Sequence, residues 1–263
     1  MKIFLLISFC LFTLIASGNE LMQRFDIGMY RPTDAGAKDL VLILKTPQLA
    51  NTVKQKFVLL KDSNPQYKIY WAAPDKLFVD VQGLPEGFKD LKNELRLAVV
   101  DKIEYILPVS LEKKLKGYDL RTQDNADGKK LIAEDKTGKM DINRLEFNIN
   151  KAGQITQIDS FGTRGPSKTF FNYSQTENNK WLVTKIENVV ERGPIKVVTT
   201  NNIIYSKVSG FYFPEKLISK SSQENMVKDK VKKVEIGTTE YLFESYEVNT
   251  GKAQKFISQD KLK

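Results

Sequence analysis

The sequence predicts a β-rich α+β protein in which a strongly curved antiparallel sheet forms an incomplete barrel and helices cover its concave face. From residue 117 onward, turn residues recur between runs rich in β-branched and aromatic residues, which is typical of a meander of antiparallel strands. One well-formed amphipathic helix is predicted over residues 86–99. A long antiparallel sheet must hide its apolar face, so it either closes into a barrel or wraps around helices. A sheet that wraps around helices would bury the apolar face of the predicted helix.

The N-terminal segment has the layout of a secretory signal peptide. A positively charged start is followed by an almost unbroken apolar run over residues 3–15, and small residues then precede Asn19. The apolar run is shorter than the roughly 20 residues of a membrane-spanning helix. We therefore expect residues 1–18 to be cleaved off near Gly18 and residues 19–263 to form a single exported domain.

The mature chain lacks two residue types on which many active sites depend. Its only cysteine, Cys10, lies in the predicted signal segment, and the chain has no histidine. Disulfides, thiolate nucleophiles, Ser-His-Asp triads and Cys- or His-ligated metal sites are excluded within it. We expect no cofactor, no metal and no enzymatic activity. The remaining catalytic alternative is an envelope hydrolase using carboxylates such as Asp80, Glu146 or Asp159, two of them about 5–10 Å apart across a groove.

The chain is basic, with a net charge of +9. The densest basic group comprises Lys228, Lys230, Lys232 and Lys233. Predicted export argues against nucleic acid as a partner, whereas anionic lipid headgroups or an acidic envelope protein fit the charge. The alternative is a solvated basic face that keeps the protein soluble.

The first third of the mature chain is predicted to mix strands and helices. Residues 39–45 form a short apolar run typical of a buried strand, which Pro47 ends. Leu49, Val53 and Phe57 then recur as one face of a short helix.

A β-hairpin is predicted next, from two alternating runs around a turn at Asp75 and Lys76. Gly83 and Pro85 close it. The apolar side chains that alternate along its two strands are Tyr67, Ile69, Trp71, Leu77, Val79 and Val81.

The helix over residues 86–99 is expected to cover the core, with membrane binding as the alternative. Its apolar positions at helical spacing are Phe88, Leu91, Leu95, Ala98 and Val99. Residues 111–115 are predicted to form a further helical turn. The strand runs that follow include residues 145–149, 169–173, 181–190, 195–200 and 241–248.

The order of these elements resembles the LolA and LolB carriers of outer-membrane lipoproteins and their relatives, including the sensor-type regulator RseB. Residues 67–74 (Tyr-Lys-Ile-Tyr-Trp-Ala-Ala-Pro) lead into residues 75–83, similar to that family's strand, proline turn and strand. Residues 210–214 (Gly-Phe-Tyr-Phe-Pro) resemble the start of one of its late strands. The resemblance covers residues 39–248.

This resemblance implies a half-barrel with a helical lid and a hydrophobic cavity for the acyl chains of a lipoprotein or lipid. The expected function is that of a monomeric periplasmic carrier or binding protein with peripheral membrane contact. An envelope sensor or regulatory module of the same fold, with a protein partner in the envelope, is the alternative.

The expected cavity lining follows from alternation along strands and from the helical face. The predicted lining residues are Ile69, Trp71, Leu77, Val79, Val81, Leu91, Leu95, Leu145, Phe147 and Ile149. The alternative is that all of them pack into a core without a cavity, which periodicity alone does not distinguish.

Overall fold

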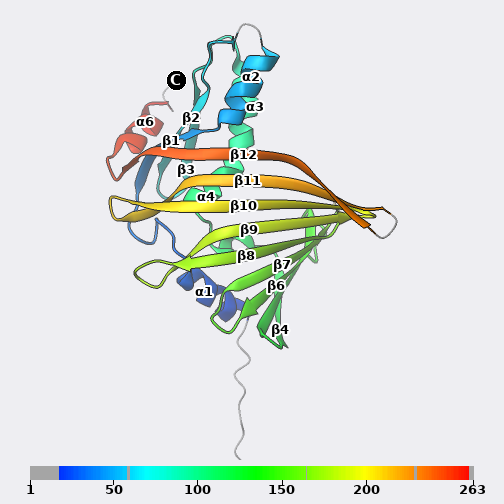
Figure 1. Ribbon diagram of the computed structural model, residues 1–263. Helices are drawn as coiled ribbons and strands as arrows, with labels where there is room; N and C mark the ends of the chain where they lie inside the picture. The colour runs from blue at the N-terminus through cyan, green and yellow to red at the C-terminus, as the bar shows by residue number, and fades with distance from the viewer. Residues whose placement is uncertain (1–17, 58–59, 164, 228–229, 261–263) are drawn as a thin grey trace, which may run out of the picture.

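The computed structural model describes residues 18–57, 60–163, 165–227 and 230–260. The predicted signal segment lies outside the described residues apart from Gly18. Twelve antiparallel strands form one sheet in the order β3-β2-β1-β12-β11-β10-β9-β8-β7-β6-β5-β4 (Figure 1). The sheet is open, with β3 and β4 at its edges. The prediction of a β-rich protein with an antiparallel sheet is therefore confirmed.

The strands are Asp39–Lys45 (β1), Gln66–Ala72 (β2), Lys76–Gln82 (β3), Asp119–Asn125 (β4), Gly128–Glu134 (β5), Ile142–Asn150 (β6), Ile155–Gly162 (β7), Ser167–Gln175 (β8), Trp181–Arg192 (β9), Ile195–Val208 (β10), Phe211–Val227 (β11) and Lys230–Val248 (β12). The helices are Gly18–Gly28 (α1), Pro47–Lys56 (α2), Lys89–Val99 (α3), Val100–Lys102 (η2), Ile103–Ile106 (α4), Leu111–Lys114 (α5) and Lys252–Asp260 (α6). None of the helices in the described ranges combines the length and apolarity needed to cross a membrane.

Strands β4 to β12 form a meander in which each strand pairs with the next one along the chain. The last strand, β12, then pairs with the first, β1, which continues through β2 to β3. The apolar run of β1 is buried on both faces, as the continuous pattern predicts, because Leu40, Leu42 and Leu44 pack into the larger core on one face and Val41 packs against α6 on the other.

One face of β1–β3 and β10–β12 carries the larger core, which we call the α3 core. Its buried residues include Leu40, Leu42, Leu44, Ile69, Trp71, Val79, Val81, Leu95, Val99, Ile103, Ile106, Phe213, Leu217 and Phe243. Helix α3 contributes Leu95 and Val99, so its apolar stripe packs on the sheet. The Nε of Arg96 also donates to the backbone oxygen of Val79 (2.9 Å).

Helix α3 begins three residues later than the sequence predicts. The chain forms a turn before it, with the backbone N–H of Phe88 donating to the oxygen of Pro85 (3.3 Å). Phe88 is the N-cap and makes no side-chain capping hydrogen bond, so the first helical residue is Lys89.

A second core lies further along the sheet, and we call it the α1–α5 core. It joins helices α1 and α5 to strands β5–β7, and its buried residues are Leu21, Met22, Leu111, Leu115, Leu131, Ala133, Phe147, Ile149 and Ile155. On the other face of β1 and β2, helix α6 packs Ala253 and Ile257 against Val41 and Ala72. Helices α1, α4 and α6 and the short helix η2 are additions to the predicted set.

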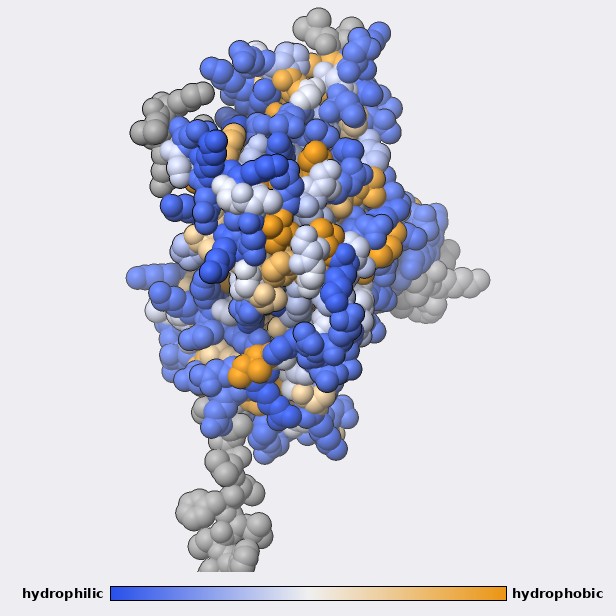
Figure 2. Space-filling model, turned by 90° about the vertical axis from the view of Figure 1, so that its left-hand side faces the viewer, coloured by the Kyte–Doolittle hydropathy of each residue, from blue (hydrophilic) through white to orange (hydrophobic). Residues whose placement is uncertain are grey.

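The surface is largely hydrophilic, with apolar side chains in a broken band down the face seen in Figure 2. Two leucines of α3 show both extremes of burial. Leu95 is 7% exposed within the α3 core, whereas Leu97 is 77% exposed. They form a matched pair on one helix.

Replacing Leu95 with alanine is expected to lower the free energy of unfolding by about 2–4 kcal/mol, because buried methyl groups are lost and a void remains. Leu97→Ala should change it by less than about 0.5 kcal/mol. Urea unfolding followed by circular dichroism measures both. Equal effects of the two substitutions would contradict the packing of α3.

Candidate ligand-binding cavity

A cavity of about 500 Å³ lies between strands β6–β11 and the helices α1, α4 and α5. It takes lining residues from both cores. Tyr105 and Tyr205 also pack against the α3 core, whereas Phe147 and Ile155 belong to the α1–α5 core. The cavity therefore lies where the two cores adjoin, and its volume is in the range of small-molecule sites.

The sheet supplies one wall through alternate residues of neighbouring strands. Phe147 of β6 is opposite Ile158 of β7, which is opposite Thr169 of β8. Phe171 of β8 is opposite Ile186 of β9. All five line the cavity. Side chains at directly opposed positions share one face of a sheet, so this register produces a continuous, mainly apolar surface.

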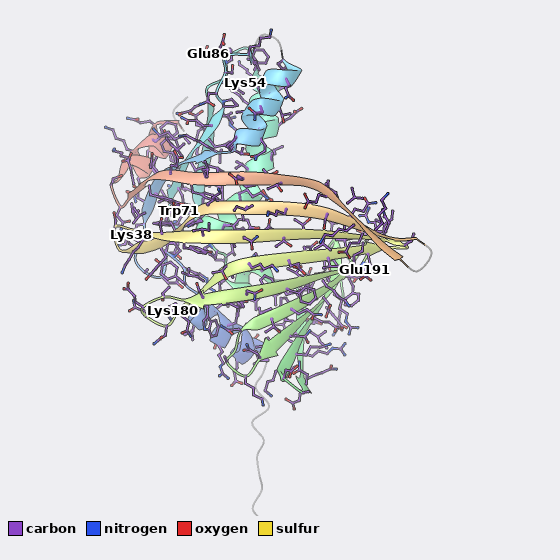
Figure 3. All side chains as sticks on the ribbon, in the orientation of Figure 1. Lys38, Lys54, Trp71, Glu86, Lys180 and Glu191 are labelled. Carbon is purple, nitrogen blue, oxygen red and sulfur yellow. The ribbon has the colours of Figure 1, made fainter. Side chains whose placement is uncertain are left out.

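Strand β9 contributes to this wall from the end near α1. Figure 3 shows Lys180 beside the turn before β9 and Glu191 at the far end of that strand. The cavity-lining residues Trp181, Leu182 and Val183 all come from the first part of β9. The site is therefore at the end of the sheet that the helices approach.

The opposite wall is helical, and the Asp26 carboxylate connects helices α1 and α5 within it. This carboxylate accepts hydrogen bonds from the backbone N–H groups of Leu111 (2.8 Å) and Glu112 (3.1 Å) at the start of α5. It also forms an ion pair with Arg31, which follows α1. Helices α1 and α5 are thus joined although they are distant in the sequence.

Gly28 permits a close approach between the end of α1 and the sheet wall. A Cβ atom at Gly28 would lie 2.2 Å from Cζ3 of Trp181. Beside this contact the backbone N–H of Tyr30 donates to the oxygen of Trp181 (2.9 Å). A side chain at residue 28 would push the indole ring or the helix away.

The charged residues of the lining are held in ion pairs. Lys114 lies 2.7 Å from Glu104, and their side chains are 46% and 54% exposed. Asp101 pairs with Lys102 at 2.6 Å. Because these charged side chains reach solvent, we assign them to the rim of the cavity. The remaining lining is mainly apolar.

The tyrosines of the lining are strongly desolvated. Burial raises the pKa of Tyr105 to about 12, with the charges of Asp101 and Glu104 adding to the effect. Burial likewise raises the pKa of Tyr173 and Tyr205. All three side chains are therefore neutral at physiological pH.

Of the ten residues predicted to line a cavity, Leu145 and Phe147 line this one. Leu91 packs partly buried against the α3 core, Ile149 lies in the α1–α5 core, and Leu77, at the start of the edge strand β3, is 40% exposed. The other five are packed into the α3 core, namely Ile69, Trp71, Val79, Val81 and Leu95. The cavity thus faces α1, α4 and α5, whereas α3 packs directly onto its strands.

The sequence reasoning missed most of the lining. Phe25 and Met29 come from α1 and its end, which were not predicted as a helix, although their spacing is helical. Phe171 and Trp181 were placed in strands but not assigned to a site. Thr169 and Phe171 alternate along β8 and so share one face of the sheet, which is the sequence signal that could have located the sheet wall of the cavity.

The three carboxylates considered for hydrolysis do not line the cavity. Glu146 is opposite Asp159 in the sheet, but it is held by Lys130 (2.7 Å) and Arg144. The hydrogen bond from Lys130 lowers the pKa of Glu146, which opposes a role as general acid. Asp80 lies apart on β3. Within the described ranges, no group of three or more potential ligands is arranged to hold a metal ion.

Comparisons of the chain with protein-family models, with curated proteins and with solved structures found no match.

Gly28→Ala is expected to destabilise the fold by about 1–3 kcal/mol, since the added methyl group overpacks the contact with Trp181. The tryptophan emission should also shift as the indole moves. Gly237→Ala is the control, because a Cβ at Gly237 meets nothing within 4 Å. Urea unfolding with fluorescence detection tests both. An unchanged Gly28→Ala variant would contradict the close approach.

Raised tyrosine pKa values predict a specific loss of stability in alkali. Unfolded tyrosines ionise near pH 10, whereas Tyr105 in the folded state ionises at about 12. The unfolded state then releases protons first, so stability is unchanged below about pH 10 and falls as the pH rises from there toward 12. Urea unfolding from pH 8 to 11, beside an absorbance titration at 295 nm, measures this. If every tyrosine ionised near pH 10 in the folded protein, the buried environment would be contradicted.

Proposed function

We propose that this protein is a periplasmic carrier or binding protein that holds the acyl chains of lipids or lipoproteins in the cavity between β6–β11 and α1, α4 and α5. The observation that carries the proposal is the composition of the walls. Aromatic and aliphatic side chains of the sheet face others from the helices, with a few polar groups among them. In this proposal the sheet acts as an incomplete barrel whose concave face the helices cover.

Burial of methylene groups would drive binding. Each contributes about 0.8 kcal/mol, so eight of them contribute roughly 6 kcal/mol. Association costs about 4–15 kcal/mol in lost translational and rotational freedom. Acyl-chain binding therefore depends on burying many methylene groups in the cavity. A substitution that reduces the cavity volume should weaken acyl-chain binding measurably.

The location and cargo in this proposal are supported by the sequence. The predicted signal peptide supports export, and the resemblance to the LolA and LolB carriers supports a lipoprotein or lipid cargo. Binding is favoured over catalysis because Glu104 and Asp101, the acidic groups of the lining, are engaged with Lys114 and Lys102.

A cavity-filling substitution tests the proposal directly. Ser160→Phe places a ring in the cavity from β7, whereas Ser174→Phe on β8 adds the same ring at an exposed position outside the lining. Losing about three buried methylenes should weaken binding by roughly 2 kcal/mol, or about 30-fold. Ser174→Phe should bind as the wild type does.

The measurement is a titration of a fluorescent acyl ester into the mature protein and both variants, each shown by circular dichroism to be folded. Native mass spectrometry of protein purified from its own envelope identifies the bound lipid. The proposal fails if the wild type shows no saturable binding, or if both variants bind equally.

A further inference from the structure

The cavity lining holds five tyrosines, and three of their hydroxyls have partners within the protein. The Tyr173 hydroxyl donates to the backbone oxygen of Ile155 (2.7 Å). The Tyr30 hydroxyl accepts the backbone N–H of Tyr212 (2.9 Å), and the Tyr212 hydroxyl hydrogen-bonds to Glu177. These three serve to hold the walls together.

Tyr105 and Tyr205 differ from the other three. Among the described residues, neither hydroxyl has a hydrogen-bond partner, although both side chains are largely surrounded by protein. The fully buried side-chain polar atoms without a partner, over the same described residues, are the Nε atoms of Arg31 and Arg144. Both tyrosine hydroxyls therefore keep accessible surface, and since both residues line the cavity, we assign that surface to it.

The two hydroxyls belong to one local environment. The Tyr205 hydroxyl lies close enough to Tyr105 for the two to interact electrostatically. Tyr105 in turn interacts with Asp101 and Glu104 at the charged rim. Tyr105 is thus the hydroxyl next to the charged rim, and Tyr205 is within electrostatic range of it.

We propose that Tyr105 and Tyr205 donate hydrogen bonds to the uncharged carbonyl of an acyl ester or amide and so fix the depth of its acyl chain. This inference rests on the proposed acyl-chain binding. Both hydroxyls face the cavity without an acceptor among the described residues, and the neutral carbonyl of a bound ligand would supply one. A fatty-acid carboxylate is disfavoured at the same place, because burying its charge beside these largely buried tyrosines costs more free energy than burying a neutral carbonyl.

The experiment measures displacement of the fluorescent reporter 1-N-phenylnaphthylamine by methyl octanoate, N-methyl octanamide, octanoate and octane. We expect the ester and amide to bind about 5- to 10-fold more tightly than octane, as one or two hydrogen bonds provide, and octanoate to bind more weakly than the ester. The ratio of ester to amide affinity shows which of the two carbonyl types the hydroxyls prefer.

The double variant Tyr105→Phe/Tyr205→Phe should lose the preference for the carbonyl while its affinity for octane stays the same. Tyr118→Phe is the matched control, since the Tyr118 hydroxyl donates to the oxygen of Ile142 (2.7 Å) and the residue is outside the lining. It should keep the wild-type preference.

Two results would overturn the inference and leave acyl-chain binding standing: an unchanged ester preference in the double variant, or tighter binding of octanoate than of methyl octanoate by the wild type. Failure of every compound and of the reporter to bind would instead reject the proposed function itself. The two failures are therefore distinguishable in one set of titrations.

Discussion

The pairing of β1 with β12 is the contact on which the rest of the structure depends. It joins the β3-β2-β1 unit to the meander β4–β12, and a hydrogen bond from the backbone of Lys38 to Asn249 there closes a separation of 211 positions. The buried Asp39 carboxylate, 2% exposed, accepts the backbone N–H of Gln254 in α6 (2.9 Å). Without this junction the α3 core would lose its β11 and β12 residues, and the two cores would not share one sheet.

Local patterns in the sequence were sufficient for much of the fold. The apolar run at residues 39–45 marked a strand buried on both faces, and the serial turns after residue 117 marked the meander. Helix α1 was not predicted, although Leu21, Phe25 and Met29 recur at helical spacing, because this short stripe directly follows the apolar run of the predicted signal segment. Helix α6 packs against β1 and β2 and against Phe78 of β3, which only the tertiary fold brings beside it.

The site was less predictable for a physical reason. Alternation indicates which side chains share a face of a strand, as for Leu145 and Phe147, but it does not say which helix covers that face. The pairing of α1 with β9 depends on the contact of Gly28 with Trp181, more than a hundred positions apart. The sequence reasoning therefore assigned α3 to the cavity wall, whereas Leu95 of α3 is packed in the core.

The walls of the cavity are fixed by contacts that do not involve its interior. Asp26 of α1 binds the start of α5, and the backbone of Tyr30, just after α1, binds β9, so both contacts position α1 against its neighbours. In the proposed function, a ligand that fills the cavity would add contacts to the apolar side chains on either side. Because such a ligand binds the folded state, it would stabilise that state by an amount that grows with the logarithm of its concentration relative to Kd. The contacts that position the cavity walls would therefore couple the proposed ligand binding to folding.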